Sequence, residues 1–228
     1  MNSLFLMGNE PSLYEAPLTY LILAITVYSS YRCMDDHYEK EKFMFIPYVI
    51  QKDQQWYRFF SHGLVHANWM HLLFNAYVLL MFGGVVEVQL KHSSIFGVLG
   101  PMVYLALYIS GLLMSSVYSF YKHRENRGYA ALGASGAVSS VVFASILLQP
   151  TAGMGLIFLP GIYLPSVLFG LLYLLYSVYM SKKGTDNIGH DAHYWGAVWG
   201  FVFLVVAKPS LFMLFLEQIR YYMLYIMG

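Results

Sequence analysis

The sequence predicts an all-α, polytopic membrane protein: a bundle of six transmembrane helices followed by a C-terminal helix in the membrane interface. Of the 228 residues, 58% are hydrophobic and only 11% are charged, against roughly 25% charged residues in soluble domains. No Asp, Glu, Lys, Arg or His occurs between Gly128 and Ser181, a stretch long enough for two bilayer crossings of about 20 residues each. The alternating pattern of a membrane barrel is missing, so the apolar runs indicate helices.

The apolar runs define six expected spans, at about residues 14–31, 59–86, 93–118, 129–149, 166–180 and 191–207. Pro150 and Pro209 end the fourth and sixth spans, since proline cannot continue a helix. The last segment, residues 210–227, is apolar but carries Glu217 and Arg220 at i,i+3 spacing, which favours a helix lying in the interface. No internal repeat or second domain is visible, so we expect residues 1–228 to form one membrane domain.

Composition also bounds the partners. The formal net charge is only +1, so the chain lacks the basic field that nucleic-acid binding uses, and we expect no nucleic-acid partner. The single cysteine, Cys33, excludes an internal disulfide. The amino terminus lacks the positively charged start and cleavage site of a signal peptide, so we expect it to remain on the mature protein.

The informative residues are polar groups at membrane depth, because such groups usually face a bundle interior or a water-filled cavity. Three expected spans carry them, each in its first half. They are His62, His66, His71 and Asn75 in the second span, Ser135 within GASGA in the fourth, and His190, Asp191 and His193 in the sixth. Since alternate spans run in the same direction, the three sets should lie at similar depth near one membrane face.

Small residues provide a way to bring two of these spans together. His193, Gly196 and Gly200 lie on one stripe of the sixth span, and the two glycines form a small-xxx-small surface that permits close helix approach. Gly133, Gly136 and Ala137 offer a matching surface around Ser135. A close crossing of the fourth and sixth spans would place the Ser135 hydroxyl within hydrogen-bond reach of His193.

The second span would add two hydrogen-bond donors to this pair. His71 and Asn75 share one face at i,i+4 spacing, whereas His62 and His66 lie about 140° or more around an ideal helix. We therefore expect His62 and His66 to be structural, bonding loop backbone or packing at the water boundary. A serine in a membrane helix is by itself more often a packing or back-bonded residue than a nucleophile, so the coincidence of four residues carries the hypothesis.

These motifs resemble those of the rhomboid intramembrane serine proteases. The resemblance includes HxxxxHxxxN from His66 to Asn75, GGVVE at residues 83–87, GASGA around Ser135 and AHxxGxxxG at residues 192–200. It implies a six-helix rhomboid-like bundle with a dyad of Ser135 as nucleophile and His193 as general base. His71, Asn75 and the Ser135 backbone N–H would stabilise the oxyanion. No metal or organic cofactor would be required.

The resemblance also marks positions outside the dyad. Arg58 is similar to the arginine of the family's Trp-Arg pair in the first loop, although here the pair reads Tyr57-Arg58 with Trp56 one position early. Glu87 is similar to the acid that closes the second helix. The family often has a tyrosine four residues after the nucleophile, stacked on the base, and this chain has Ser139 there.

The implied reaction is endoproteolytic cleavage of single-span transmembrane proteins in the lipid bilayer. By resemblance, we expect a multi-pass protein of the bacterial cytoplasmic membrane, with both termini cytoplasmic and the site opening outward. Counting Lys and Arg in the loops favours the opposite orientation. The acids and apolar stretch of the long first loop weaken that count, so we favour the family's orientation.

Two other functions remain open from the sequence. The HxxxH of His62 and His66 and the HxxH of His190 and His193 have spacings that could chelate a metal, so a metal-dependent membrane enzyme is one alternative. That alternative leaves GASGA unexplained. The other is a catalytically inactive rhomboid-like protein that only binds transmembrane partners, which the presence of both Ser135 and His193 disfavours.

Overall fold

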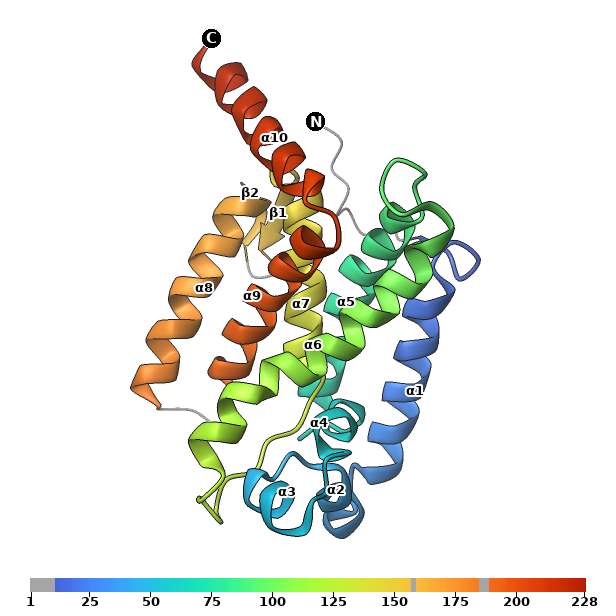
Figure 1. The fold of residues 1–228 in the computed structure, drawn as a ribbon, viewed down its shortest axis with the longest axis vertical. Coiled ribbons are helices and arrows are strands. Elements are labelled where there is room, and N and C mark those ends of the chain that lie inside the picture. Colours follow the sequence, from blue (N-terminus) through green and yellow to red (C-terminus); the bar gives the residue numbers. More distant parts are fainter. Residues whose placement is uncertain (1–10, 157–158, 185–188) are drawn as a thin grey trace.

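The computed structural model describes residues 11–156, 159–184 and 189–228, and these residues are mostly helical (Figure 1). The helices are α1 (Pro17–Cys33), α2 (His37–Phe43), α3 (Pro47–Asp53), α4 (Arg58–Ser61), α5 (Trp69–Leu90), α6 (Gly100–His123), α7 (Ser135–Leu148), α8 (Ser166–Lys183), α9 (His190–Ala207) and α10 (Ser210–Met227). Two 3-10 turns, η1 (His62–Leu64) and η2 (Gly97–Leu99), and an antiparallel hairpin of β1 (Gly153–Leu156) and β2 (Leu159–Pro165) complete the described part.

Helix α7 runs through the middle of the bundle, with α1 and α8 at opposite edges (Figure 1). It contacts α5, α6, α8 and α9. By length and composition, two described helical segments could cross a bilayer, α5 and residues 97–123. A third is added if α9 and α10, which meet at a bend of 113°, count as one span. The protein is therefore a mostly helical polytopic membrane protein.

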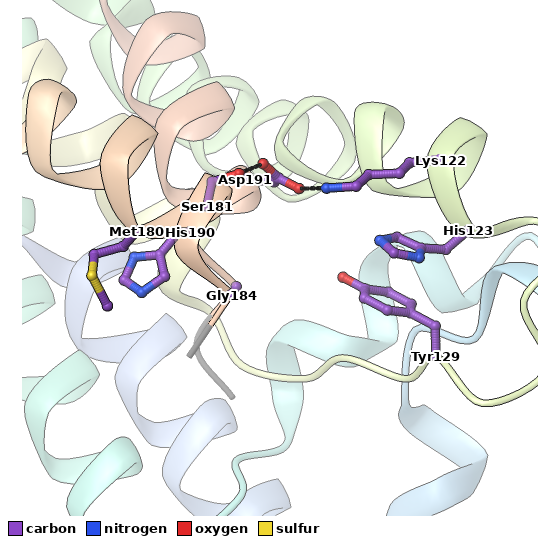
Figure 2. Close-up of a pocket in the computed structure, with 9 residues that line it drawn as sticks. Lys122, His123, Tyr129, Met180, Ser181, Gly184, His190 and Asp191 are labelled. Carbon is purple, nitrogen blue, oxygen red and sulfur yellow. Dashed lines mark hydrogen bonds and ion pairs between the residues drawn. The ribbon is translucent and has the colours of Figure 1, made fainter. Parts of the chain in front are cut away.

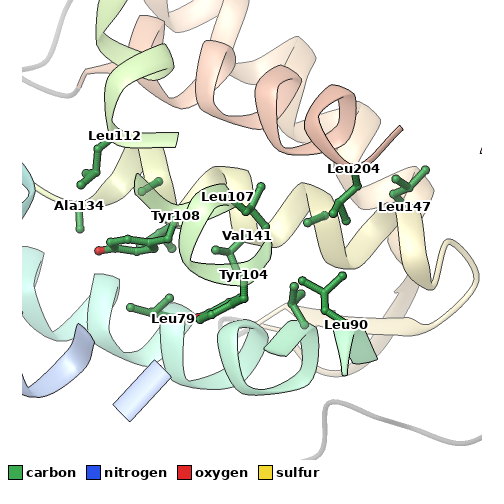
Figure 3. Close-up of a cluster of buried hydrophobic side chains, with 14 of the residues drawn as sticks. Leu79, Leu90, Tyr104, Leu107, Tyr108, Leu112, Ala134, Val141, Leu147 and Leu204 are labelled. Atoms are coloured by element: carbon green, nitrogen blue, oxygen red, sulfur yellow. The ribbon is translucent and has the colours of Figure 1, made fainter. Parts of the chain in front are cut away.

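The core lies where α5, α6, α7 and α9 meet (Figure 3). Tyr104 and Leu107 of α6, Val141 of α7 and Leu204 of α9 have no exposed surface. Large side chains of α5, α6 and α9 pack there with Ala137, Val141 and Ala144 of α7. The core thus holds α7 from several sides and fixes the helix on which Ser135 lies.

The expected second span is wrong at its start. The polar stretch from residue 59 to 68 forms α4, η1 and an extended segment, and the long helix α5 begins only at Trp69. Asn68 has extended backbone angles, and its side-chain oxygen accepts a hydrogen bond of 2.9 Å from the His71 N–H. This cap satisfies one of the open N–H groups at the helix start. His62 and His66 therefore lie outside the helix that carries His71 and Asn75.

The expected fourth span also begins late, because α7 starts at Ser135. The loop over residues 124–134 leads from the end of α6 into the bundle (Figure 1). On the way, Ala131 and Phe45 exchange two backbone hydrogen bonds of 2.8 and 2.9 Å, which pairs this loop with the first loop. Backbone pairing of this kind, rather than helix, satisfies the polar groups just before Ser135.

Two buried charged residues fasten the outer parts of the fold. The Glu87 carboxylate on α5 accepts hydrogen bonds from the N–H groups of Leu18 and Thr19, at 3.1 and 2.8 Å, and so caps the start of α1. The Arg58 guanidinium donates to the carbonyl oxygens of Glu41 and Met44, each at 2.7 Å. Arg58 thereby holds the first loop in place through its backbone, which is a structural role.

Helix α10 turns away from the bundle at the end of α9 (Figure 1). Leu211 and Phe215 are buried against the core, while most of the remaining helix is exposed. The predicted helix over residues 210–227 is therefore present as a helix. Its position in the membrane interface stays a prediction.

Candidate active site

The closest approach between helices in the site joins α7 to α9. A Cβ on Gly196 would overlap the carbonyl oxygen of Gly136, and a Cβ on Gly200 would overlap that of Ser140. The Ser140 hydroxyl also donates a hydrogen bond of 2.8 Å to the Gly196 carbonyl oxygen. The small-residue crossing expected from the sequence is confirmed for Gly196 and Gly200, which meet the backbone of Gly136 and Ser140, whereas Gly133 faces the His71 ring and not α9.

Ser135 and His193 adjoin this crossing. Ser135 is the half-buried first residue of α7, and Gly136 follows it. A Cβ on Gly136 would lie 3.5 Å from the carbonyl oxygen of Ala192, the residue before His193. His193 is in the first turn of α9 and is also half-buried. The neighbours of the two predicted residues are thus in contact across the helix pair.

His71 reaches the loop immediately before Ser135. Gly133 has a φ of +114°, and a Cβ built on it would lie 2.6 Å from Cε1 and 2.9 Å from Nε2 of His71. A side chain at residue 133 would therefore be strained by its backbone and would displace the imidazole. Gly133 lets the His71 ring sit directly against the backbone two residues before Ser135.

Asn75 lies one turn beyond His71 on α5 and is buried. Its Nδ2 donates a hydrogen bond of 2.9 Å to the His71 carbonyl oxygen. An amide nitrogen carries two hydrogens, so this bond uses one of the two donors of Nδ2. His71 and Asn75 therefore lie at i,i+4 on one helix as predicted, and the bond between them runs to the His71 backbone and not to its ring.

The remaining histidines of the motif hold the loop that leads to Ser135. The Ala134 N–H donates to Nε2 of His66 at 3.3 Å, and Nδ1 of His66 is 2.9 Å from the Ser30 hydroxyl. The His62 carbonyl oxygen accepts from the Gly133 N–H at 2.9 Å. The expectation that these two histidines bond loop backbone is confirmed.

Their side chains are poorly placed to share a metal ion. Both ring nitrogens of His66 are within hydrogen-bond distance of Ser30 and Ala134, and Nε2 of His62 is 3.2 Å from the Ser116 hydroxyl. A metal ligand offers an unprotonated nitrogen lone pair to the ion. Among the residues that the structure describes, no three His, Cys, Asp or Glu side chains gather as a metal-binding group.

Aromatic rings surround His193 on α9. The Tyr173 ring of α8 stacks on it with centroids 6.4 Å apart and planes inclined by 23°. The His190 ring meets it edge-on at 5.9 Å. Stacked and edge-to-face pairs in this range are favourable. No sequence pattern distinguishes Tyr173, which is one of 21 tyrosines and lies in an evenly apolar helix.

Ser139 connects α7 to this tyrosine. Its hydroxyl is 2.8 Å from the Tyr173 hydroxyl. Residues 135 and 139 are four apart, so both side chains lie on one face of α7. The small Ser139 thus leaves room for a ring that enters from α8.

A small polar cavity of about 150 Å³ opens where α6 and α8 end and α9 begins (Figure 2). Asp191 lies between two partners there: Lys122 Nζ is 2.7 Å from its Oδ2, and the Ser181 hydroxyl bonds its Oδ1. Across the cavity, His123 and Tyr129 stack with centroids 3.7 Å apart. Both Asp191 oxygens are therefore engaged with α6 and α8.

The part of the chain that contains these residues is similar to known proteins. The family model described as the rhomboid domain matches residues 53–210. The chain belongs to the rhomboid family. The matched region contains α5 to α9 and hence Ser135, His193, His71 and Asn75.

Individual relatives are distant. "Presenilin-associated rhomboid-like protein A, mitochondrial" from Danio rerio is 33% identical over 138 residues, covering 59% of this chain and 33% of that protein. "RHOMBOID-like protein 12, mitochondrial" from Arabidopsis thaliana is 29% identical over 148 residues, 58% and 40% of the two chains. "Rhomboid protease GlpG" from Haemophilus influenzae is 27% identical over 172 residues, 74% and 80%. This rhomboid chain thus matches less than half the length of either mitochondrial relative.

Proposed function

We propose that this chain is an intramembrane serine endopeptidase in which Ser135 is the nucleophile and His193 the general base. The crossing of α7 and α9 carries the proposal. The contact of α9 with the Gly136 carbonyl oxygen requires glycine at residue 196, and it brings together the turns on which Ser135 and His193 lie. Family membership supports the same chemistry, since one bacterial relative is named a rhomboid protease.

Three kinds of donor are available to an oxyanion near Ser135. The first N–H groups of α7 have no helical carbonyl to bind, and the helix dipole favours negative charge at this end. The His71 imidazole lies against Gly133, and Asn75 has a second amide hydrogen one turn farther along α5. Donors fixed in place before the reaction stabilise the charge that develops on a carbonyl oxygen.

The reaction then proceeds in two halves. His193 takes the proton from the Ser135 hydroxyl as Oγ attacks the scissile carbonyl carbon, and it returns that proton to the leaving amine. The C–N bond breaks, and the acyl group stays on Ser135. Water, deprotonated by His193, attacks the ester, which releases the new carboxyl end and restores the serine.

The short length of α7 supports access of water. Its 14 residues span about 21 Å at 1.5 Å each, less than the roughly 30 Å of a hydrocarbon core. At least one end of the helix therefore lies inside the membrane. Irregular backbone at that depth is tolerated where it is buried in protein or lines a water-filled cavity. The polar groups around Ser135 suit such a cavity.

The proposal extends to the membrane context. We assign the six spans to α1, α5, α6, α7, α8 and α9, with α10 in the interface. The substrates would be single-span membrane proteins whose helix unwinds at the cleavage site, because a helical peptide hides its carbonyl groups. The bacterial cytoplasmic membrane, with the site opening outward, is the proposed location, supported by the coverage of the bacterial relative, 74% of this chain and 80% of that protein.

Replacing the nucleophile tests the reaction. Ser135→Ala should abolish cleavage of a single-span substrate in reconstituted vesicles and labelling by a fluorophosphonate probe, because the attacking oxygen is lost. His193→Ala should be nearly as inactive, and the double variant no worse, since the two residues act as one unit. Thermal unfolding in detergent should be unchanged for Ser135→Ala, because removing one hydroxyl creates no large void.

Matched controls separate the alternatives. Ser93→Ala and His92→Ala change exposed residues outside the site and should retain wild-type cleavage and labelling. Wild-type activity in Ser135→Ala would refute the serine mechanism, and loss of activity with a chelator would favour a metal enzyme. Absence of both labelling and cleavage in the wild type would favour a binding protein.

A further inference from the structure

We propose that Tyr173 of α8 is a positioning residue that holds the His193 imidazole in its working orientation, with Ser139 as its anchor. This inference rests on the proposed function, because it assigns a task to the base of the dyad. The contacts that carry it are the Tyr173 ring on His193, with centroids 6.4 Å apart, and the 2.8 Å contact between the Tyr173 and Ser139 hydroxyls.

A base of this kind needs orientation. Rotation about the terminal bond of a histidine side chain is broad and roughly two-fold, so the ring of a half-buried histidine requires neighbours that select one plane. The Tyr173 ring lies nearly parallel to that plane, at an inclination of 23°. Asp191, the nearest acid along α9, is bound to Lys122 and Ser181. The Tyr173 ring is thus placed to select the plane of the His193 imidazole, the part that a carboxylate plays in a triad.

Tyr173 is itself fixed from three directions. Phe169, one turn earlier on α8, stacks on it with centroids 6.4 Å apart, and Phe143 of α7 contacts it at 5.8 Å. The hydroxyl meets that of Ser139, one turn before Phe143 on α7. A ring that is stacked on one neighbour and bonded at its hydroxyl has few alternative positions, so it can transmit a fixed orientation to His193.

The placement of Tyr173 on α8 sets it apart from its neighbours. Leu171, Leu172 and Leu175 are exposed along the outer side of this helix, whereas Tyr173 is turned inward and half-buried. Ser139 is small enough to accept the ring tip. A tyrosine at residue 139 would compete for the same space. Only one of the two positions, 139 or 173, can therefore place an aromatic ring on His193.

The test compares ring removal with ring retention. Tyr173→Leu should lower kcat by about tenfold, the upper end of what a favourable aromatic pair contributes. KM should change less than twofold, because the proposed task of the ring is to orient the base and not to bind the substrate. The labelling rate of Ser135 by a fluorophosphonate should fall in parallel. Tyr173→Phe keeps the ring, so its drop in kcat should be less than half of the drop seen in Tyr173→Leu.

Two further variants make the test specific. Tyr179→Leu is the same change at an exposed position on the same helix and should match the wild type. The exchange Ser139→Tyr with Tyr173→Ser moves the ring from α8 to α7 and should recover at least a third of wild-type kcat. A purely structural role for Tyr173 would not be rescued by a ring on another helix.

Each outcome is decisive. Wild-type kcat in Tyr173→Leu, or an increase in KM alone, overturns the inference while leaving the dyad intact. An equal loss in Tyr173→Phe and Tyr173→Leu also overturns it, because the hydroxyl and not the ring would then matter. If Tyr173→Leu does not fold in detergent, the phenylalanine variant and the exchange still decide. Undiminished cleavage by Ser135→Ala instead removes the proposed function, and this inference with it.

Discussion

Helices α7 and α8 both border the candidate site, but different contacts hold them in the fold. Every residue of α7 from Gly136 to Leu147 is buried, and its contact with α9 runs through backbone atoms. On α8 only Ser166, Gly170 and Ser177 are buried, and its outer side exposes leucine and tyrosine. The nucleophile candidate thus belongs to a helix that is buried along almost its whole length, and the stacking ring to a helix that is largely exposed.

The chemistry of the two contacts explains the difference. In a membrane, lipid is as apolar as leucine, so helices associate through close packing of small residues and through interhelical hydrogen bonds. The α7 and α9 pair uses both, with Gly196, Gly200 and the Ser140 hydroxyl. Helix α8 depends more on side-chain contacts near its ends and middle, such as Ser139 with Tyr173 and Asp191 with Ser181.

The largest effect should follow from a methyl group at the α7 and α9 crossing. Gly200→Ala should cost about 3 kcal/mol or more in the free energy of unfolding, because the new Cβ would overlap the Ser140 carbonyl and force the helices apart. Equilibrium unfolding in detergent measures this. Gly128→Ala, a loop change with a nearest Cβ contact of 3.5 Å, should have little effect. Equal stability of the two variants would contradict the close crossing.

An intermediate effect is expected from the hydrogen bond at the same crossing. Ser140→Ala removes the 2.8 Å bond to the Gly196 carbonyl oxygen and should lower the free energy of unfolding by about 1 kcal/mol. The hydroxyl also bonds within its own helix, so the carbonyl of Gly136 loses only a secondary partner. Ser94→Ala, at an exposed loop position, is the matched control in the same unfolding assay. A stability equal to that of wild type would show that packing alone holds the pair.

The smallest effect should come from the contact between Asp191 of α9 and Ser181 at the end of α8. Asp191→Asn removes the charge that pairs with Lys122, whose side chain is 40% exposed, and should cost about 0.5 kcal/mol or less. Hydrogen exchange should nevertheless quicken in the last turns of α8, because Ser181 loses an ionised partner. Leu175→Ala, on the exposed face, should change neither quantity. Faster exchange in α7 than in α8 would contradict the comparison between the two helices.

Several features of the fold followed from the sequence alone. The scarcity of charge predicted a membrane protein, because charged groups are costly in hydrocarbon. The spacing of Gly196 and Gly200 predicted the close crossing with the helix that follows Ser135, since small residues four apart share one face. The assignment of His62 and His66 as structural residues agrees with their loop contacts, although the helix angle on which it rested does not exist, since both residues precede α5.

Other features depended on residues far apart in the chain. Helix starts at Trp69 and Ser135 were missed because Asn68 capping and the pairing of Ala131 with Phe45 override the apolar pattern. Tyr173 could not be distinguished from the other tyrosines, since its meeting with Ser139 and His193 requires three helices to be placed. Periodicity reports which face of a helix is apolar. Only the packing of the helices decides which neighbour that face contacts and at which position along the helix axis. That packing places an aromatic ring of α8 on His193.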